Sequence, residues 1–268
     1  MNATSITLAI VLCGLAAYLV LRLQQQARYR TLSGAIETVA PGANAPTMRA
    51  FAAGAVPQFD RRLISVRDFL PEDAFTRLRE EVSRLVDTER SFVPAHKKGG
   101  TIAYETLIKS APCAVALYHS RDFQRFLSGI VGEKLVPTPL NDQSSLSVLF
   151  YERPGDHIGW HYDHDYYRGR HFTVLLAIEN RGRAEGGLSA ATLFARIGGQ
   201  ETPLPTAPNT LVFFEGAKVL HKVTPIAEGE RRVVLSMTYA TDTRSTIALA
   251  VARRLKDTAF FGVRALWT

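Results

Sequence analysis

The sequence predicts a mainly β protein with bracing helices (α+β), built as a jelly roll and preceded by an N-terminal transmembrane helix. Three observations lead to this prediction. The chain begins with one long apolar run, continues with segments of helical spacing, and changes from residue 144 onward to short segments rich in Val, Leu, Phe, Thr and Tyr. Many short strands separated by turn residues are typical of antiparallel sandwiches and jelly rolls.

The apolar run Thr4–Leu23 contains one charged residue, Arg22, at its end. As a helix rising about 1.5 Å per residue, it would span roughly 30 Å, the thickness of the hydrocarbon core of a bilayer. A cleaved signal peptide is the alternative, but it would have positive residues before the run, whereas Arg28 and Arg30 follow it. We therefore expect residues 1–25 to be a single-pass anchor with the remainder of the chain on the cytoplasmic side of the membrane.

The next part of the chain is expected to be a linker followed by a domain. Residues 26–58 have no sustained hydrophobic period and predict a linker of poorly defined structure, and the domain is expected over 59–242. Pro71 suits the first turn of a helix, whose apolar face would be formed by Phe75, Leu78, Val82 and Leu85. A second helical stretch, 111–131, is expected to break near Ser120.

Strands are expected from residue 144 onward. The candidate segments are SLSVLFYE, HIGWHYD, HFTVLLAIE, ATLFARI, NTLVFFEG and RRVVLSMTYAT. Turn residues such as Pro154-Gly155 and Gly186-Gly187 separate them. Residues 243–268 begin like a helix with Ile247, Ala250 and Val251 on one face, and we expect a helical tail packed against the domain.

Composition excludes several classes of protein. A length of 268 residues, 46% hydrophobic and 21% charged, suits one globular domain with an appendage and excludes general disorder. Cys13 and Cys113 lie in different regions and no CxxC pair exists, so we expect neither a disulfide framework nor a thiolate zinc site. The net charge of +7 comes from Lys and Arg spread along the chain, so nucleic-acid binding is not expected.

The segment GDHIGWHYDHD contains the first candidate metal ligands. Positions i and i+2 of a strand point to the same face, so His161 and Asp163 would present an imidazole and a carboxylate together. His157, His164 and His171 are nearby, but only His161 begins an H-x-D. This pair alone is weak evidence, because a surface His beside a surface Asp is a common arrangement.

A third ligand is available downstream. His221 follows the apolar segment NTLVFF, and two His with one carboxylate form the arrangement used by non-haem Fe(II) oxygenases. A turn at Gly229 would return the chain as the next strand, with Arg231 pointing into the cavity of the metal. A buried guanidinium there matches a planar carboxylate, although a structural Arg–carboxylate pair is the alternative. Arg232 would then face the opposite side of the strand.

These segments together resemble the 2-oxoglutarate- and Fe(II)-dependent dioxygenases of the prolyl 4-hydroxylase type. The resemblance covers residues 60–242 and is strongest over 146–239. It is carried by a Y-x-x-P-G segment, the H-x-D, a Glu-Gly-Gly turn, the distal His and a Gly-x-Arg after it. The family implies a double-stranded β-helix fold, Fe(II), 2-oxoglutarate, O₂ and often ascorbate.

The resemblance also implies roles for individual residues. The iron ligands would be His161, Asp163 and His221. Arg231 would bind the distal carboxylate of 2-oxoglutarate, Tyr151 would lie against this co-substrate, and Thr173 would line the same pocket. Family members that halogenate replace the metal carboxylate by a small residue, so the retained Asp163 favours hydroxylation of a C–H bond, with 2-oxoglutarate and O₂ converted to succinate and CO₂.

The substrate is not predicted beyond its general class. A small molecule, a lipid or a protein side chain would each suit an enzyme anchored at a membrane. One alternative with the same chemistry is a nucleic-acid demethylase, which would want a basic groove and base-stacking aromatics. Another is a non-catalytic, membrane-tethered jelly roll that binds metal or a sugar and requires neither Arg231 nor a co-substrate pocket.

Overall fold

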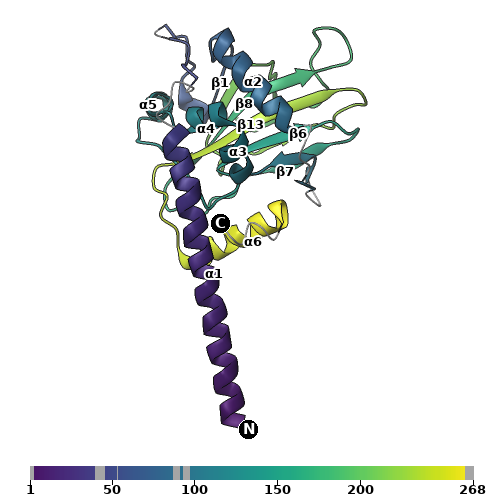
Figure 1. Cartoon of the computed structure of the whole chain (residues 1–268). Coiled ribbons are helices and arrows are strands. Elements are labelled where there is room, and N and C mark those ends of the chain that lie inside the picture. Colours follow the sequence, from purple (N-terminus) through teal and green to yellow (C-terminus); the bar gives the residue numbers. More distant parts are fainter. Residues whose placement is uncertain (1–2, 40–45, 53, 87–90, 93–96, 263–268) are drawn as a thin grey trace.

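The computed structural model describes residues 3–39, 46–52, 54–86, 91–92 and 97–262 (Figure 1). Its helices are α1 (Ala3–Val39), the 3₁₀ turn η1 (Phe59–Arg61), α2 (Glu72–Val86), α3 (Tyr104–Ser110), α4 (Pro112–His119), α5 (Arg121–Val131) and α6 (Ile247–Phe261). Its strands are β1 (Leu63–Val66), β2 (Ser91–Phe92), β3 (Lys97–Lys98), β4 (Gly100–Ile102), β5 (Val136–Pro137), β6 (Leu146–Tyr151), β7 (His157–His161), β8 (His171–Arg181), β9 (Leu193–Ile197), β10 (Gln200–Leu204), β11 (Leu211–Phe214), β12 (His221–Val223) and β13 (Arg231–Ala240).

The strands form two antiparallel sheets. The larger has the order β1-β11-β8-β13-β6-β4-β2, with β5 paired to β13, and the smaller has the order β10-β9-β12-β7-β3. Most neighbours in each sheet, such as β8 and β13 or β7 and β12, are far apart in the sequence, as in a jelly roll, which confirms the predicted fold class. All six predicted strand segments contain a strand. The strands that the sequence did not predict are short, and β10 carries Pro203 and polar residues at a sheet edge.

Strict alternation along β8 and β13 separates two cores. On β13, Val233, Leu235 and Met237 point to the helical side, where they join the main hydrophobic cluster. Val234 points to the opposite side and packs in a second cluster between the two sheets. Because side chains alternate in a strand, each long strand supplies one residue set to the helices and the other to the interior of the jelly roll.

The bracing helices cover the outer face of the larger sheet. The predicted apolar face of α2 is buried at Phe75, Leu78 and Val82. The predicted break at Ser120 is confirmed, because α4 ends at His119 and the Ser120 hydroxyl accepts a hydrogen bond from the Phe123 amide of α5 at 3.3 Å.

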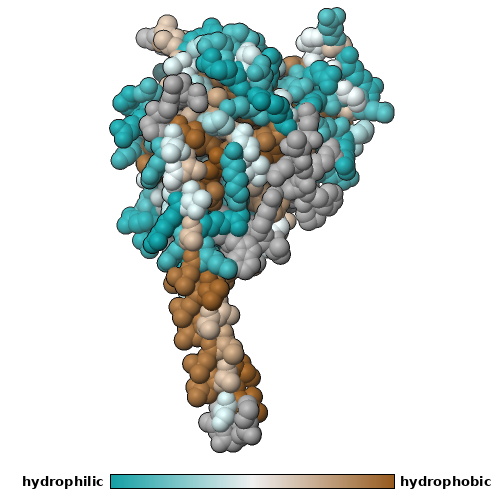
Figure 2. All heavy atoms as spheres, in the orientation of Figure 1, coloured by the Kyte–Doolittle hydropathy of each residue, from teal (hydrophilic) through white to brown (hydrophobic). Residues whose placement is uncertain are grey.

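Helix α1 is longer than the sequence predicted. The linker expected from residue 26 is wrong as far as Val39, because the helix continues and its residues Leu32, Ile36 and Val39 pack against the main hydrophobic cluster. Residues 40–45 and 53 of the expected linker lie outside the described residues. The earlier turns of α1 are exposed and apolar, and Figure 2 shows them as a hydrophobic stem projecting from a mostly hydrophilic domain. By length and composition this helix can cross a membrane.

Candidate metal centre

The three predicted ligands come together between the two sheets. His161 ends β7, Asp163 follows it, and His221 begins β12, which pairs with β7 so that the two histidines are direct cross-strand partners. One donor atom from each residue lies within 4.8 Å of the others. The Asp163 Oδ1 atom is 3.6 Å from Nε2 of His161 and 3.7 Å from Nε2 of His221.

Backbone carbonyls hold both imidazoles in the form that binds a metal. Nδ1 of His161 is 2.9 Å from the Gly159 carbonyl, and Nδ1 of His221 is 2.9 Å from the Val219 carbonyl. A carbonyl only accepts, so each Nδ1 carries the proton and each Nε2 presents its lone pair to the other ligands. Burial also lowers the pKa of His221, which favours the neutral, ligating form.

Asp163 is fixed in its ionised form. Burial would raise the pKa of its carboxyl, but the neighbouring His221 and His161 and the Thr173 hydroxyl outweigh this effect and hold the pKa well below its usual range. The Thr173 hydroxyl donates to Oδ2 at 2.5 Å, and the Asp163 amide donates to the Gly216 carbonyl at 3.0 Å. A Cβ at position 216 would lie 2.7 Å from Oδ2, so only glycine leaves room for the carboxylate.

This donor set fits a divalent iron. Ligand atoms about 2.1 Å from a common centre and 90–120° apart lie about 3.0–3.6 Å from one another, close to the 3.6 and 3.7 Å that separate Asp163 Oδ1 from the two imidazoles. Two neutral imidazoles and one carboxylate on one side of a metal, with the other side open, suit Fe(II) better than Mg²⁺ or Ca²⁺, which prefer oxygen ligands.

A small inner cavity of about 60 Å³ lies on one side of the three ligands. It is walled by residues from both sheets, including Tyr151 of β6, Thr173 of β8 and Arg232 of β13. Tyr151 is buried, and burial raises the pKa of its phenol to about 12, so this group stays protonated. The structure thus brings the predicted Tyr151 and Thr173 to the metal cluster.

The prediction for Arg231 is wrong, because the cavity contains Arg232. The guanidinium of Arg231 lies outside, with its Nε 3.4 Å from Glu152 and 3.2 Å from Glu179. Arg232 is on the same face of β13 as Val234 and Ser236, which also line the inner cavity. The sequence contained a signal for this choice in the second half of β13, where the even-numbered positions carry Ser236, Thr238 and Ala240 and the odd-numbered ones carry Leu235, Met237 and Tyr239.

Arg232 is a buried cation without a carboxylate partner among the described residues. Its side chain is 2% exposed, lies over the ring of Tyr151, and donates from Nη2 to the Thr206 hydroxyl at 3.2 Å. Its Nε has no hydrogen-bond partner among the residues that the structure describes, and burial lowers the pKa of the guanidinium. An unpaired buried charge is costly, so this arrangement calls for an anionic ligand.

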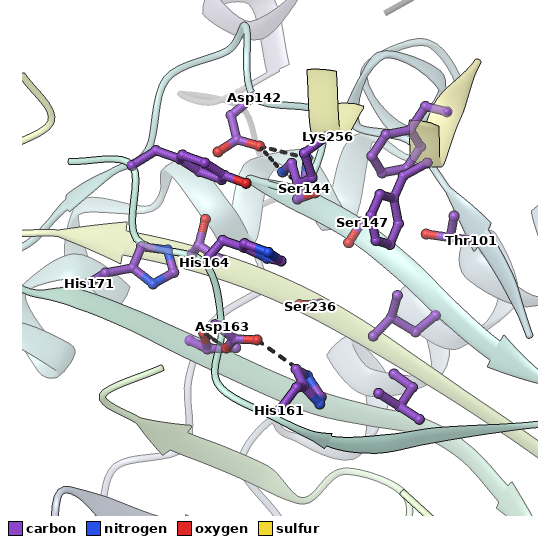
Figure 3. A pocket seen from close by; sticks show the side chains of 17 residues that line it. Thr101, Asp142, Ser144, Ser147, His161, Asp163, His164, His171, Ser236 and Lys256 are labelled. Atoms are coloured by element: carbon purple, nitrogen blue, oxygen red, sulfur yellow. Dashed lines mark hydrogen bonds and ion pairs between the residues drawn. The ribbon is translucent and has the colours of Figure 1, made fainter. Parts of the chain in front are cut away.

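A larger outer cavity of about 150 Å³ also borders the ligands (Figure 3). It shares His161, Asp163 and Thr173 with the inner cavity, so a metal held there would face both. His164 and His171 line the outer cavity, whereas His157 does not. The imidazole of His171 has a buried Nδ1 with no protein partner among the described residues.

Helix α6 forms one wall of the outer cavity with Lys256, Phe260 and Phe261. Lys256 is held in place by Asp142 at 3.1 Å and by Asp257 at 2.9 Å, and Figure 3 shows Asp142 and Lys256 across the cavity from Asp163. The sequence alone did not indicate these residues, because the fold brings α6 to the cavity from about 100 positions beyond the Asp142 loop.

The geometry agrees with comparisons to known families. The model of the 2OG-Fe(II) oxygenase superfamily matches residues 146–239, and the model of the family described as Halogenase D matches residues 53–191, just over half of the chain. The chain belongs to the 2OG-Fe(II) oxygenase superfamily and to the Halogenase D family. The resemblance to this superfamily that the sequence indicated is confirmed. No curated protein sequence matches the chain.

Several solved structures share the fold. A Pseudomonas putida prolyl-4-hydroxylase is 17% identical with a TM-score of 0.53, and the alignment covers 69% of this chain and 95% of the other. AviO1 from Streptomyces viridochromogenes is 18% identical with a TM-score of 0.54, covering 75% and 99%. The carbocyclase SnoK from nogalamycin biosynthesis is 12% identical with a TM-score of 0.57, covering 73% and 87%. At these identities the likeness shows the fold, while the reactions named differ.

Proposed function

We propose that this protein is an Fe(II)- and 2-oxoglutarate-dependent dioxygenase that hydroxylates a C–H bond of a substrate held in the outer cavity. The single observation that carries the proposal is Arg232, a buried guanidinium without an acidic partner among the described residues, which shares the inner cavity with the His161, Asp163 and His221 cluster. A cation and a metal site that line the same small cavity match a co-substrate with a carboxylate at one end and a chelating 2-oxo acid at the other.

Each residue of the cluster has a defined task in this proposal. His161, Asp163 and His221 would hold the iron, and Thr173 keeps the Asp163 carboxylate in place. Arg232 would bind the distal carboxylate of 2-oxoglutarate, with Tyr151 packed against it. When bound, iron with 2-oxoglutarate and O₂ supplies the oxidation, releasing succinate and CO₂. The outer cavity positions the substrate and limits the access of water. Ascorbate would serve to keep the iron reduced.

Halogenation is a second candidate because the Halogenase D model matches the chain. In members that halogenate, a small residue stands in place of the metal carboxylate. Here Asp163 is present, half-buried, ionised and hydrogen-bonded at that position. A ligand held in this way occupies the place that a halide would need, so we favour hydroxylation.

The proposal is tested with the purified full-length chain in detergent. We expect formation of succinate from 2-oxoglutarate that depends on Fe(II) and O₂, continues slowly without substrate, and is the same with or without chloride. Mass spectrometry of the products would show a gain of oxygen and no halogen. Binding of Fe(II) with no succinate formed would instead support the non-catalytic, metal-binding jelly roll.

We further propose that α1 anchors the enzyme in a membrane with the domain on the cytoplasmic side. Support comes from the exposed apolar turns of α1 and from Arg22, Arg28 and Arg30 on their C-terminal flank. In intact cells, a membrane-impermeant thiol reagent should not label a Glu185→Cys variant, whose position is exposed in the β8–β9 loop, and should label it after lysis. Labelling of this cysteine in intact cells would mean that the domain lies on the outer side of the membrane and that the proposed orientation is wrong.

A further inference from the structure

Helix α6 exposes its apolar residues and buries charged ones, the reverse of a helix on the surface of a soluble protein. Its exposed residues are all apolar: Ile247, Ala248, Val251, Ala252, Leu255 and Ala259. The exposed fractions of Ile247, Val251 and Leu255 are 86%, 52% and 66%. A surface helix in water normally presents charged residues outward and buries its apolar stripe. The apolar face predicted at the start of this helix therefore exists, but at Ile247 and Val251 it points away from the domain.

The charged residues of α6 point inward instead. Arg253 and Asp257 are buried, and Lys256 pairs with Asp142 beneath the helix. Arg253 donates to the Asn141 side chain at 2.8 Å. These contacts fix the rotation of α6 about its axis, because turning the apolar stripe inward would expose the aromatic wall and break the buried ion pairs. The exposed apolar stripe is therefore a fixed feature of the fold.

Helix α6 lies where α1 leaves the domain. Nη2 of Arg254 is 3.5 Å from Oε1 of Gln25, the first buried residue of α1, and Figure 1 shows α6 lying across the base of the domain beside α1. The exposed apolar part of α1 ends at Leu23, just before this contact. A run of this length is about as long as a bilayer core is thick, so its end marks the membrane surface.

Positive charge gathers at the same level. Arg254 contacts Gln25, three residues after Arg22 on α1, and burial together with the neighbouring charges of Arg253 and Arg22 lowers the pKa of Arg254. Anionic lipid headgroups would relieve this repulsion. Apolar residues outward and arginines at the rim form the pattern of a helix that lies in the plane of a membrane surface.

We infer that α6 is an interfacial helix that rests on the bilayer in which α1 is inserted, with Ile247, Val251 and Leu255 in the apolar phase. The inference rests on the proposed anchoring by α1. Since α6 also walls the outer cavity with Lys256, Phe260 and Phe261, this contact places the substrate cavity at the level of the lipid headgroups. Amphiphiles of the membrane then have a short path to the metal centre.

The test measures membrane depth and requires no turnover, so it is independent of oxygenase activity. The full chain is reconstituted in vesicles of phosphatidylcholine and phosphatidylglycerol, with or without phosphatidylcholine brominated on its acyl chains, and carries a bimane fluorophore on one cysteine. Native Cys13, exposed on α1, reports insertion of the anchor, and Cys113 is buried with its thiol pKa raised to about 12, so it should stay unlabelled. Val251→Cys, which reports α6, and Glu185→Cys are each introduced singly in a Cys13→Ser background.

Glu185→Cys is the matched control. Glu185 lies in the loop after β8, and β8 extends roughly 30 Å from the end of the domain that contacts α6 to this loop. We expect brominated lipid to remove about half or more of the bimane emission at positions 13 and 251, as for a side chain buried about 5–10 Å deep, and none at position 185. Quenching at 13 without quenching at 251 would overturn the inference and leave the anchor intact. Quenching at neither position would overturn both. A blue shift at 251 that brominated lipid does not quench would identify a second copy of the chain on this face and also overturn it.

Discussion

His161→Ala is expected to abolish high-affinity Fe(II) binding and the formation of succinate from 2-oxoglutarate. His161 supplies one of three donor atoms that lie within 4.8 Å of one another, and two remaining donors cannot hold the metal on one face. Loss of groups that merely orient a ligand weakens metal affinity about 10–100-fold, so loss of the ligand itself should exceed this range. Anaerobic equilibrium dialysis against Fe(II), followed by a succinate assay, measures both effects.

The matched control is His157→Ala. This histidine is on the same strand, β7, but its Nδ1 contacts the Gly155 carbonyl and its ring lines neither cavity. We expect His157→Ala to bind iron and turn over 2-oxoglutarate like the original chain. Full activity of His161→Ala, in a variant whose circular dichroism shows it to be folded, would mean that the ligand assignment is wrong.

Arg232→Ala is expected to raise the KM for 2-oxoglutarate strongly while leaving Fe(II) affinity unchanged. Removing one partner of a buried, hydrogen-bonded charge pair costs about 2–5 kcal/mol, which corresponds to roughly 30-fold to several-thousand-fold in affinity. The guanidinium touches none of the three ligands through a hydrogen bond described in this structure, so the metal site should persist. Co-substrate affinity is measured by titration of 2-oxoglutarate under anaerobic conditions, and iron by dialysis.

Arg231→Ala separates this role from a general effect of charge. Arg231 is adjacent and pairs with Glu152 and Glu179 outside the cavity. An ion pair of this partly exposed kind contributes at most about 1 kcal/mol, so the KM should change by less than about tenfold. A larger increase in the KM for 2-oxoglutarate in Arg231→Ala than in Arg232→Ala would instead assign the binding of the distal carboxylate to Arg231. Arg232→Lys keeps the charge without the planar fork and should give an intermediate value.

The choice between Arg231 and Arg232 illustrates where reasoning from sequence fails. The turn at Gly229 and the returning strand were both predicted correctly. The error was in which face of the strand points into the cavity, because shifting the alternation of side chains by one residue exchanges the two faces. The composition of β13 contained the missing information, since Ser236 and Thr238 share a face with Arg232 while Met237 and Tyr239 face the helical core.

Helix α6 illustrates a different failure. Its helical character and the apolar positions at its start were visible in the sequence, and burial of that face was the default expectation. The buried ion pairs of Lys256 depend on Asp142, which belongs to a loop before β6, and no local pattern predicts such a pairing. Local periodicity shows that a helix has an apolar face, whereas only the tertiary partners decide which way that face points.

The sequence by itself predicted an apolar helix long enough to cross a membrane, the antiparallel strands, and the cluster of His161, Asp163 and His221 that could hold a metal. These follow from local causes, namely hydropathy over a membrane-sized run, alternation within strands, and an H-x-D with a distal His. The tertiary structure alone decided that α1 continues to Val39, that Arg232 rather than Arg231 enters the inner cavity, and that α6 closes the outer one. Those outcomes depend on register and on contacts between distant segments, which are set by packing of the whole fold and not by any single stretch of the chain.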